Sequence, residues 1–388
     1  MAERRAPRVI LIKGACNYDH LRCFADAMKL GFEDEGAVAV CVDLAMGPPD
    51  ATFAAALTRF EPDLVLSFNL DGVRLAGPDG RPLGGGRVPL TTWMVDEPYY
   101  QRSWAAELRA PHVRTLWTNE RSSAEARAME LPEAETMLLA GRVLPRVRGE
   151  DRDIDVFFAG SVVDPEGISR GWPTSIGPAV AKLMGAASEA WVADLTRPLR
   201  EVFRETCEAA GVGGHEGIRR LEPMVLGEIN RFVRAKVRLA VMRDLADLPL
   251  TVVGDGWDRL VPGSAWVTRP AVPYYVYEEM VSRAKVTLCV QPVHGHVASE
   301  RYFASLANGS ALVVNDNRWL AEAFGELHAP FSLTDVSGAR ARLEALLSDE
   351  PAREEMAQAA RERVAATHTW HHRARALLER AAKAARAA

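Results

Sequence analysis

A charged pair, Glu300 and Arg301, stands at the head of an otherwise apolar helical run in the stretch SERYFASLANGSALVVNDN, residues 299–317. Ser299 precedes the pair and is a plausible helix N-cap. Unpaired N–H groups and a partial positive charge make a helix N-terminus a good phosphate site. Arg301 is unfavourable toward that dipole unless an anion, such as a diphosphate, lies in front of it. The stretch therefore predicts an anion site.

The role of Glu300 stays open between two alternatives. Its carboxylate suits the first turn of a helix and could accept hydrogen bonds from sugar or ribose hydroxyls, or it could pair with a neighbouring basic group. His294 lies in the loop before the predicted helix, and Asn315 lies at the end of the strand after it. Both are at strand ends, so we expect them near the anion site.

Two strand-to-glycine turns lie upstream, FFAGSV with Gly160 and Ser161, and VVGDGW with Gly254 and Gly256. Glycine lets a backbone approach a ligand closely. Neither turn contains a complete GxGxxG sequence, so neither predicts a dinucleotide site by itself. The alternative is a tight turn that only reverses the chain.

In the first half, the stretch WMVDEP ends a predicted strand with the carboxylates Asp96 and Glu97 before a proline. The two side chains point in different directions if the strand continues, so they do not form a paired acid–base site. One of them could act as a general base, and Asp96 is our candidate. A capping or turn role for Asp96 is the alternative.

Other strand-end loops of the first half offer hydrogen-bonding groups for a substrate. The loop-to-helix junction KGACNYDHLR contains Asn17 and His20, and DLVLSFNLDG ends in Asn69 and Asp71. His20 could act as a base or contact an acceptor, or it could simply face solvent at a helix start. The other three side chains could hydrogen-bond an acceptor.

Signals for a metal or a covalent nucleophile are weak. Asp153 and Asp155 form a DxD sequence, but they fall where a linker enters a strand. His368, His371 and His372 crowd the start of the last predicted helix, where packing explains them better than ligation. No HExxH, GxSxG or GxxxxGK[ST] sequence is present. We therefore expect no metal site and no cofactor.

Strands and helices must alternate to position these loops. A length of 388 residues suggests two domains, at roughly 100–200 residues each. Apolar strands separated by helical periodicity predict two doubly wound parallel α/β sheets, which bind ligands beyond the carboxyl ends of their strands. We expect a Rossmann-like domain at residues 1–148, a second at 149–365 with a mostly helical segment at 174–247, and a last helix at 366–388. Expected strands cover residues 8–14, 37–44, 63–72, 89–98, 114–120, 135–141, 155–161, 250–256, 285–292 and 310–316.

Bulk properties exclude some classes of protein. The net charge of −5 argues against nucleic-acid binding driven by overall charge. No apolar run approaches the roughly 20 residues that span a bilayer. The five cysteines form no CxxC or other metal spacing, which favours a reducing cytoplasm. The sequence predicts no oligomeric state.

Several stretches resemble bacterial glycosyltransferases of the GT-B fold, in particular the CgeB-like branch of the glycosyl transferases group 1. They are DVFFAGS, VVGDGW, SRAKVTLCVQP, ERYFASLANGSALVVND and REEMAQAARERVAATHTWHHRARALL, and together they cover about residues 155–380. In the first half, DLVLSFN and WMVDEP look like the family's strand ends. Family members often end with a helix, a His-Thr-Trp or His-Thr-Tyr, and an Arg-containing helix that crosses back to the first domain.

The resemblance implies two Rossmann-like domains that face each other across a cleft. The second domain would hold a nucleoside diphosphate sugar, and the first would hold an acceptor. Arg301 falls where the family often has an arginine near the donor phosphates, and Gly160 and Gly254 fall on its donor-side turns. Residues 272–275, with Tyr274, are expected near the nucleotide base. No divalent metal would be required, since helix dipoles and basic side chains can stabilise the leaving diphosphate.

This sequence departs from the family pattern at one position. Many members read R-x-F-E, with a glutamate that contacts the donor ribose, and Ala304 stands at that place here. The E-x7-E signature of the broad retaining family is also absent, which favours inversion with Asp96 as base. We therefore expect an inverting transfer to a hydroxyl of a protein, glycan or small molecule. A non-catalytic relative that binds a ligand or assists assembly of a surface structure, and a nucleotide-sugar epimerase, are the alternatives.

Overall fold

The computed structural model describes residues 5–46, 59–75, 90–110, 113–128, 130–131, 134–148, 151–292 and 297–387. The chain divides into two compact units. Unit 1 comprises Met1–Val143, Pro273–Tyr275 and Arg363–Ala388, and unit 2 comprises Leu144–Val272 and Val276–Glu362. The expected boundaries at residues 148/149 and 365/366 stay a prediction about which parts of the chain fold independently.

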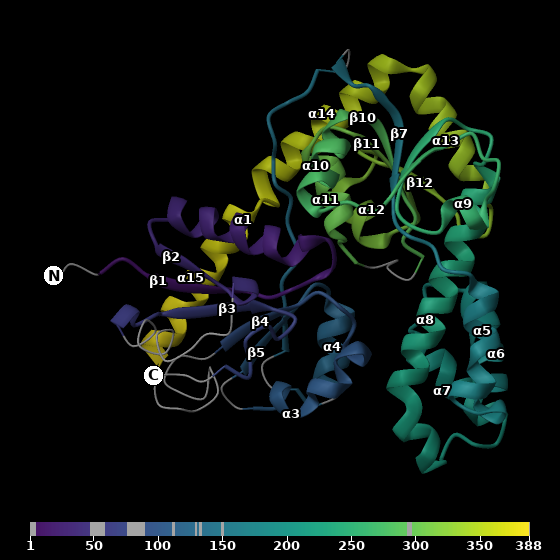
Figure 1. The fold of residues 1–388 in the computed structure, drawn as a ribbon. Helices are drawn as coiled ribbons and strands as arrows, with labels where there is room; N and C mark the ends of the chain where they lie inside the picture. The colour runs from purple at the N-terminus through teal and green to yellow at the C-terminus, as the bar shows by residue number, and fades with distance from the viewer. Residues whose placement is uncertain are drawn as a thin grey trace. The chain divides into compact units, whose positions relative to one another are not determined.

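Unit 1 contains a six-stranded parallel sheet in the order β2-β1-β3-β4-β5-β6 (Figure 1). Apolar strand sequences such as Leu64–Phe68 are buried along their whole length, as expected for a sheet covered on both faces. The chain order reverses between β1 and β3. The strands are β1 (Arg8–Lys13), β2 (Val38–Asp43), β3 (Leu64–Phe68), β4 (Leu90–Met94), β5 (Val113–Trp117) and β6 (Ala134–Thr136).

Helices α1 (His20–Asp34) and α15 (Trp370–Ala387) pack against each other in unit 1. The ring centroids of Phe24 and Trp370 lie 4.9 Å apart, and the guanidinium of Arg375 contacts the Glu35 carboxylate at 2.7 Å. The end of the chain thus returns to the unit that contains its beginning, which confirms the expected crossing helix. The other helices of unit 1 are η1 (Asn17–Asp19), η2 (Leu44–Met46), η3 (Pro98–Trp104), α3 (Ala105–Leu108) and α4 (Glu120–Ala128).

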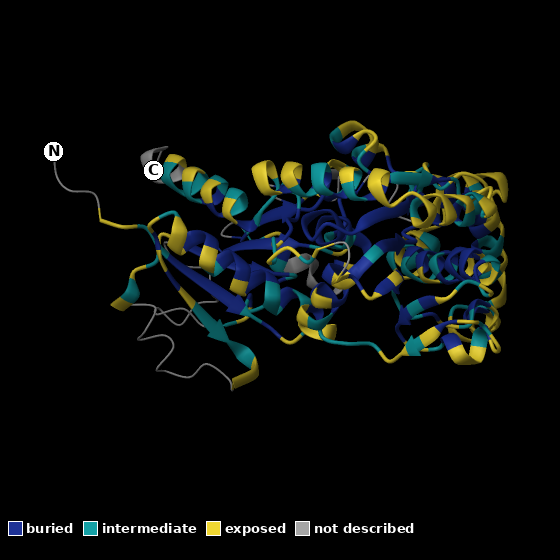
Figure 2. Cartoon of the chain, turned by 90° about the horizontal axis from the view of Figure 1, so that it is seen from above, coloured by how far each residue is buried: buried dark blue, intermediate teal, exposed yellow. Residues whose placement is uncertain are grey.

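Unit 2 contains a second six-stranded parallel sheet, in the order β12-β11-β10-β7-β8-β9. Here the chain order reverses between β7 and β10. Figure 2 shows the strands of the sheets as largely buried. The strands are β7 (Ile154–Ala159), β8 (Leu250–Val253), β9 (Val267–Arg269), β10 (Ala284–Cys289), β11 (Ala311–Asn315) and β12 (Ala329–Phe331).

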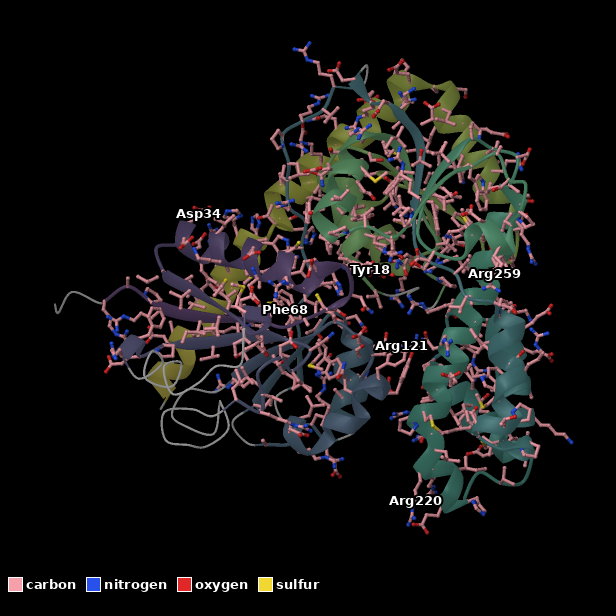
Figure 3. All side chains as sticks on the ribbon, viewed as in Figure 1. Tyr18, Asp34, Phe68, Arg121, Arg220 and Arg259 are labelled. Carbon is pink, nitrogen blue, oxygen red and sulfur yellow. The ribbon has the colours of Figure 1, made fainter. Side chains whose placement is uncertain are left out.

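A helical bundle is inserted between β7 and β8, as the sequence predicted for residues 174–247. It consists of α5 (Pro165–Ser175), α6 (Pro178–Ala193), α7 (Leu199–Ala209) and α8 (Glu216–Asp244). Figure 3 places Arg220, near the start of α8, at the end of the bundle far from the sheet of unit 2. The last turns of α8 supply Leu239, Val241 and Met242 to the apolar core at the sheet, so this one helix joins bundle and sheet.

The remaining helices of unit 2 are α9 (Trp257–Leu260), α10 (Tyr274–Arg283), α11 (Glu300–Ala307), α12 (Arg318–Phe324) and α13 (Ser337–Ser348), and α14 (Glu350–Thr367) leads toward unit 1. No helix among the described residues is both long and apolar enough to cross a membrane.

The α/β class with two Rossmann-like sheets is confirmed, whereas some details differ or cannot be compared. The sequence also predicts a helix over residues 51–62 and a turn-rich stretch over residues 77–88. Most of the first and all of the second lie outside the described residues. Sequence patterns missed β12, because it has three residues and contains Pro330, a residue that fits only the edge of a sheet.

A substitution at Gly254 tests how tightly the turns after β7 and β8 are packed. The φ of Gly254 is +144°, and a Cβ there would lie 2.5 Å from the Gly160 carbonyl. We expect Gly254→Ala to lower the free energy of unfolding by about 2–4 kcal/mol, from backbone strain and overpacking. The matched control is Gly185→Ala within α6, where open space surrounds the new methyl group and stability should rise by about 0.5–1 kcal/mol. Urea denaturation measures both, and equal midpoints for Gly254→Ala and wild type would contradict the packing described here.

Candidate functional site

Two arginines meet at the point in unit 2 where the strand order reverses. Arg301, in the first turn of α11, donates from Nη1 to the Ala159 carbonyl at 2.7 Å. Arg238, in α8, donates to the carbonyls of Ser161 at 2.9 Å and Val290 at 3.4 Å. A Cβ built on Gly160 would lie 3.2 Å from Nη1 of Arg238 and 3.3 Å from Nη1 of Arg301. Both guanidinium groups therefore lie against the same glycine.

Among the described residues, no carboxylate pairs with the guanidinium of Arg238. The side chain is almost entirely buried, with 6% exposure, and its Nε has no hydrogen-bond partner in the part of the chain that the structure describes. Burial holds the pKa of Arg238 well below its usual range, and the positive charges of Arg234 and Arg301 act in the same direction. Two like charges beside a glycine turn, at the carboxyl ends of β7 and β10, favour an anion at this place.

The start of α11 is built as the sequence predicted. The Ser299 hydroxyl accepts a hydrogen bond from the Arg301 backbone N–H at 3.3 Å, so Ser299 is the N-cap. The same hydroxyl donates to the Glu300 carboxylate at 2.9 Å, and that carboxylate lies 3.6 Å from Nε of Arg301. Glu300 thus orients the cap and Arg301 in this structure.

Ser161, Gly254 and Gly256 have structural roles that are visible without a ligand. The Gly160 N–H donates to the Val253 carbonyl at 2.8 Å, and the Asp255 N–H donates to the Ser161 hydroxyl at 3.0 Å. A Cβ on Gly256 would lie 2.3 Å from the Val162 carbonyl oxygen. The space that these glycines leave is therefore filled by the neighbouring turn. Their contact with a donor stays a prediction.

The other predicted donor residues are spread around this edge. Asn315 accepts from the Gln291 N–H at 2.7 Å and so joins the ends of β10 and β11. Tyr274 is grouped with unit 1, where its ring packs edge-on against Phe24 at 5.3 Å. His294 lies outside the described residues. Ala304 is 1% exposed within α11, so its methyl group fills a core position.

In unit 1, Asn69 joins the ends of β3 and β4. Its side-chain oxygen accepts from the Val95 N–H at 2.9 Å, and its amide donates to Asp96 at 2.8 Å. Asn69 adopts a left-handed backbone with φ of +45°, which asparagine tolerates better than most residues. The exposed Asp96 carboxylate is thereby oriented, as a positioned base requires.

Asp71 lies where β1 and β3 reverse the strand order of unit 1. A Cβ on Gly14 would lie about 2.1 Å from the Asp71 carboxyl, so only glycine at residue 14 leaves room for that group. Partial burial raises the pKa of Asp71 to about 6, although a backbone hydrogen bond from Gly14 opposes the shift. A carboxylate with this pKa is a better proton acceptor at neutral pH than an ordinary aspartate.

Glu97 is a second carboxyl group of unit 1 with a raised pKa. Burial raises the pKa of Glu97 to about 7, and the negative charges of Glu125 and Asp96 add to the effect. The Ser122 hydroxyl donates to Glu97 at 2.8 Å, and Asn119 holds Ser122 through two hydrogen bonds. The sequence offered Glu97 only as an alternative to Asp96, because the local pattern does not show which carboxylate is desolvated.

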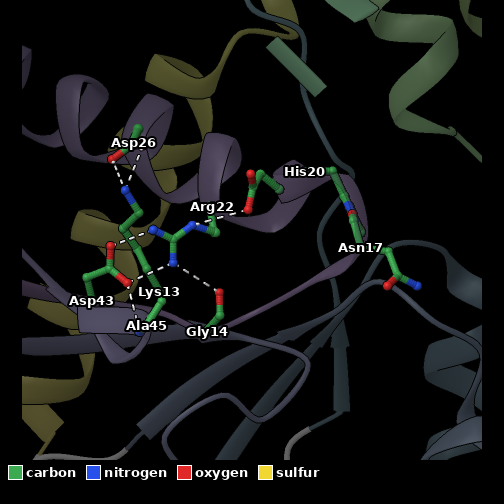
Figure 4. A network of polar contacts seen from close by, with 9 residues as sticks. Lys13, Gly14, Asn17, His20, Arg22, Asp26, Asp43 and Ala45 are labelled. Atoms are coloured by element: carbon green, nitrogen blue, oxygen red, sulfur yellow. Dashed lines mark hydrogen bonds and ion pairs between the residues drawn. The ribbon is translucent and has the colours of Figure 1, made fainter. Parts of the chain in front are cut away.

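Two ion pairs lie beside the loop that follows β1, residues 14–19 (Figure 4). Lys13 pairs with Asp26 at 2.8 Å, and Arg22 holds the Asp43 carboxylate through two hydrogen bonds. His20 donates from Nδ1 to the Asn17 carbonyl, 2.8 Å away, which positions its ring.

Beside this loop, the Asn17 side chain is exposed. The pKa of the Cys16 thiol is lowered by hydrogen bonding to His20 and to backbone, against the opposing effect of burial.

The residues that a metal would need are engaged elsewhere or dispersed. Asp153 pairs with Arg283, and Asp155 pairs with Lys285 at 2.6 Å. His371 pairs with Asp34, which ties α15 to α1. No group of three or more metal-ligating side chains occurs among the described residues.

Residues 234–379 match the family described as glycosyl transferase-like. This segment contains Arg238 and Arg301 and all strands of unit 2 except β7. No curated protein matches the sequence.

Solved structures with a similar fold cover nearly the whole chain. Sucrose-phosphate synthase from Thermosynechococcus elongatus is 10% identical, with a TM-score of 0.58 over 99% of this chain and 100% of that one. A glycosyltransferase from Rickettsia africae is 8% identical, with a TM-score of 0.56 over 98% and 99%. HepE from Anabaena, in complex with UDP and glucose, is 10% identical, with a TM-score of 0.51 over 97% and 100%. At these identities the likeness shows the fold, and it confirms the expected GT-B fold.

The raised pKa of Glu97 predicts a pH-dependent stability change. In the unfolded chain this carboxyl loses its proton near its ordinary pKa of 4.5, whereas the folded protein holds it up to about pH 7. Stability is therefore lost as pH rises from about 4.5 to 7. We expect Glu97→Gln to stabilise the protein by on the order of 2–3 kcal/mol at pH 8 and to have little effect at pH 4, measured by urea denaturation.

The control for this prediction is Glu120→Gln. Its carboxylate is exposed in the first turn of α4, where a negative charge favours the helix. That variant should lose a little stability at pH 8. A Glu97→Gln protein that is equally stabilised at both pH values would contradict a buried carboxyl that titrates near neutrality.

Proposed function

We propose, from a glycosyl transferase-like domain at residues 234–379 in a chain with the GT-B fold, that this protein transfers a sugar from a nucleoside diphosphate sugar to an acceptor hydroxyl. The acceptor is a protein, a glycan or a small molecule. The proposal includes inversion at the anomeric carbon, independence of a divalent metal and a bacterial cytoplasmic setting. HepE is described in complex with UDP and glucose, so UDP-sugars are the first donors to test.

The observation that carries the proposal is the pair Arg238 and Arg301 beside Gly160. Burial and the neighbouring positive charge of Arg301 destabilise the charged form of Arg238, unless a negative charge compensates it. A donor diphosphate at this place would supply that charge and would accept hydrogen bonds from both side chains. Its location beyond β7 and β10 is where open α/β sheets bind nucleotides.

The same two side chains would assist the reaction. As the sugar leaves the donor, negative charge grows on the released nucleoside diphosphate. Fixed guanidinium groups and the capped N-terminus of α11 would stabilise that charge without moving. Glu300 would keep Arg301 in place through the contact at 3.6 Å, or would accept from donor hydroxyls after a change of partner.

Unit 1 would supply the base that takes the proton from the acceptor hydroxyl. Asp96 is the first candidate, because it is exposed and its carboxylate is oriented by Asn69. His20 is the second, and Asp71 becomes a third because of its raised pKa. Asn17, Asn69 and Asp71 are the proposed acceptor contacts.

A non-catalytic relative is the second candidate function. Ala304 favours it, because a buried methyl group stands where related enzymes are expected to carry a ribose-binding carboxylate. Nucleotide release from a panel of nucleotide sugars separates the two. A catalyst releases nucleotide with acceptor present, a non-catalytic relative binds nucleotide without releasing it, and an epimerase needs no acceptor.

Arg301→Ala and Arg238→Met should each lower turnover by roughly 10²–10³-fold, because each removes one stabilising donor at the leaving diphosphate. Nucleotide release gives turnover, and calorimetry with UDP gives binding, which should also weaken. Thermal melting checks that each variant is folded.

The matched control for the arginine pair is Arg220→Ala. Arg220 is exposed on α8, pairs with Glu216 and lies far from the sheet of unit 2 (Figure 3). It should leave turnover unchanged. Unchanged turnover in folded Arg301→Ala and Arg238→Met proteins would refute the diphosphate site.

Asp96→Asn should lower kcat by roughly 10²–10⁴-fold while UDP still binds, because a general base acts on the acceptor and not on the nucleotide. His20→Gln and Asp71→Asn are the comparison variants. Asp71 is the base, and the assignment of Asp96 is wrong, if Asp71→Asn abolishes turnover instead and the turnover of wild type decreases as the pH drops below about 6, the pKa of Asp71.

A further inference from the structure

A cavity of about 630 Å³ lies in unit 2, away from the arginine pair. Residues that follow β10, β11 and β12 form one side of it, among them Pro292, residues 315–318 and residues 332–334. Residues 192–196, which connect α6 to α7, form the other side. A space of this size beyond the carboxyl ends of strands is typical of a small-molecule site. The inserted bundle therefore completes a ligand-sized cavity.

His328 contributes a neutral ring to the lining of this cavity. The residue is 5% exposed. Burial lowers the pKa of the imidazole, although a backbone hydrogen bond to Gly325 opposes the shift, so the ring is neutral at pH 7. The ring therefore adds surface to the lining without adding charge.

The charges around the cavity disfavour an anionic ligand. Asp194 and Asp316 contribute carboxylates to its lining. The guanidinium of Arg318 is held by Glu322 at 2.7 Å, which leaves the lining without excess positive charge. A phosphate or diphosphate would therefore bind at the arginine pair and not here.

The lining suits a ligand that alternates hydroxyls with apolar faces. Asp194 accepts from the N–H and hydroxyl of Thr196, so the loop between α6 and α7 holds a fixed shape. Leu195 and Leu333 add apolar surface beside these polar groups. Carbohydrates have this mixture of hydroxyl edges and apolar CH faces, and bind through such combinations of donors, acceptors and apolar contacts.

The cavity is connected to the start of α11 by hydrogen bonds. The Asn317 amide donates to the Val297 carbonyl at 3.0 Å, two residues before the N-cap Ser299. The Asn317 side-chain oxygen accepts from the Leu320 N–H at 2.8 Å, which fixes the loop at the start of α12. A ligand in the cavity would therefore contact the loop that positions the end of α11 carrying Arg301.

We infer that this cavity binds an uncharged carbohydrate, a sugar unit of the acceptor, so that the acceptor is a glycan. The choice of a carbohydrate rests on the proposed glycosyl transfer. The neutral ring of His328, the lack of excess positive charge and the loop contributed by the bundle are observations of the cavity itself.

The test measures binding of neutral sugars by saturation-transfer NMR. The probes are methyl glycosides of glucose, galactose, mannose and N-acetylglucosamine, together with maltotriose, and glucose 6-phosphate is the charged comparison. Ala193→Trp places an indole in the cavity from the end of α6, and Ala190→Trp places the same group on an exposed position of that helix outside the lining. UDP binding is measured for all three proteins.

At least one neutral probe should bind wild type and Ala190→Trp, and Ala193→Trp should weaken that binding by about tenfold or more, since the indole competes for the space. UDP binding should be equal in the three proteins. The proposal is overturned if no neutral probe binds wild type, if Ala193→Trp binds like wild type, or if glucose 6-phosphate binds better than the neutral sugars. A different result would separate this site from the proposed function. If Ala193→Trp loses sugar binding but none of the three proteins binds UDP, the proposed function is refuted and the sugar site stands.

Discussion

The buried charge of Arg238 is the constraint on which unit 2 depends. A guanidinium in a nearly dry site is destabilised unless its N–H groups find acceptors, and here the backbone carbonyls of Ser161 and Val290 accept from Nη1 and Nη2. Ser161 lies two residues after the end of β7, and Val290 directly follows β10. The arginine therefore ties the two strands together at the point where their order reverses. Arg152, also buried, donates to three carbonyls and lies near Arg146, Arg353 and Arg361, but the Glu354 carboxylate opposes the lowering of its pKa.

The glycine turns keep those carbonyls in place. Gly254 lies against the carbonyl of Gly160, and the Trp257 indole donates to the same carbonyl at 2.7 Å. A side chain at residue 254 would separate the turns after β7 and β8. The arrangement explains why Gly254 and Gly256 occur together without a complete dinucleotide motif. Their first task is to let two turns pack backbone to backbone, and the arginine pair is then presented on a rigid edge.

The sequence predicted what local patterns encode. Apolar runs spaced by helical periodicity correctly indicated the parallel sheets, and Ser299 was correctly placed as an N-cap. Arg238 could not be recognised, since α8 also contains Arg231, Arg234 and Arg243, and only tertiary packing decides which arginine turns inward. The sequence favoured Asp96 over Glu97 for the same reason. Alternation along a strand shows that neighbouring side chains point in opposite directions, but it does not show which of the two carboxylates is desolvated. His328 has no sequence signal, because its cavity is formed by segments that are distant in the sequence, residues 192–196 and residues from Pro292 onward.

Ionisable groups near the strand ends of both units are held in environments that disfavour their charged forms. In unit 1, desolvation raises the pKa of Asp71 and Glu97, so these carboxyls hold protons more tightly than usual. In unit 2, desolvation lowers the pKa of Arg238. Neither pKa shift stabilises the fold, since the charged form of each group is stabilised less by the protein than by water. Perturbed groups of this kind gather at functional sites, because a ligand or a reacting proton can supply the compensation that the fold withholds. In the proposed transfer, a carboxylate of unit 1 would accept the proton of the acceptor hydroxyl, and Arg238 and Arg301 of unit 2 would stabilise the released diphosphate.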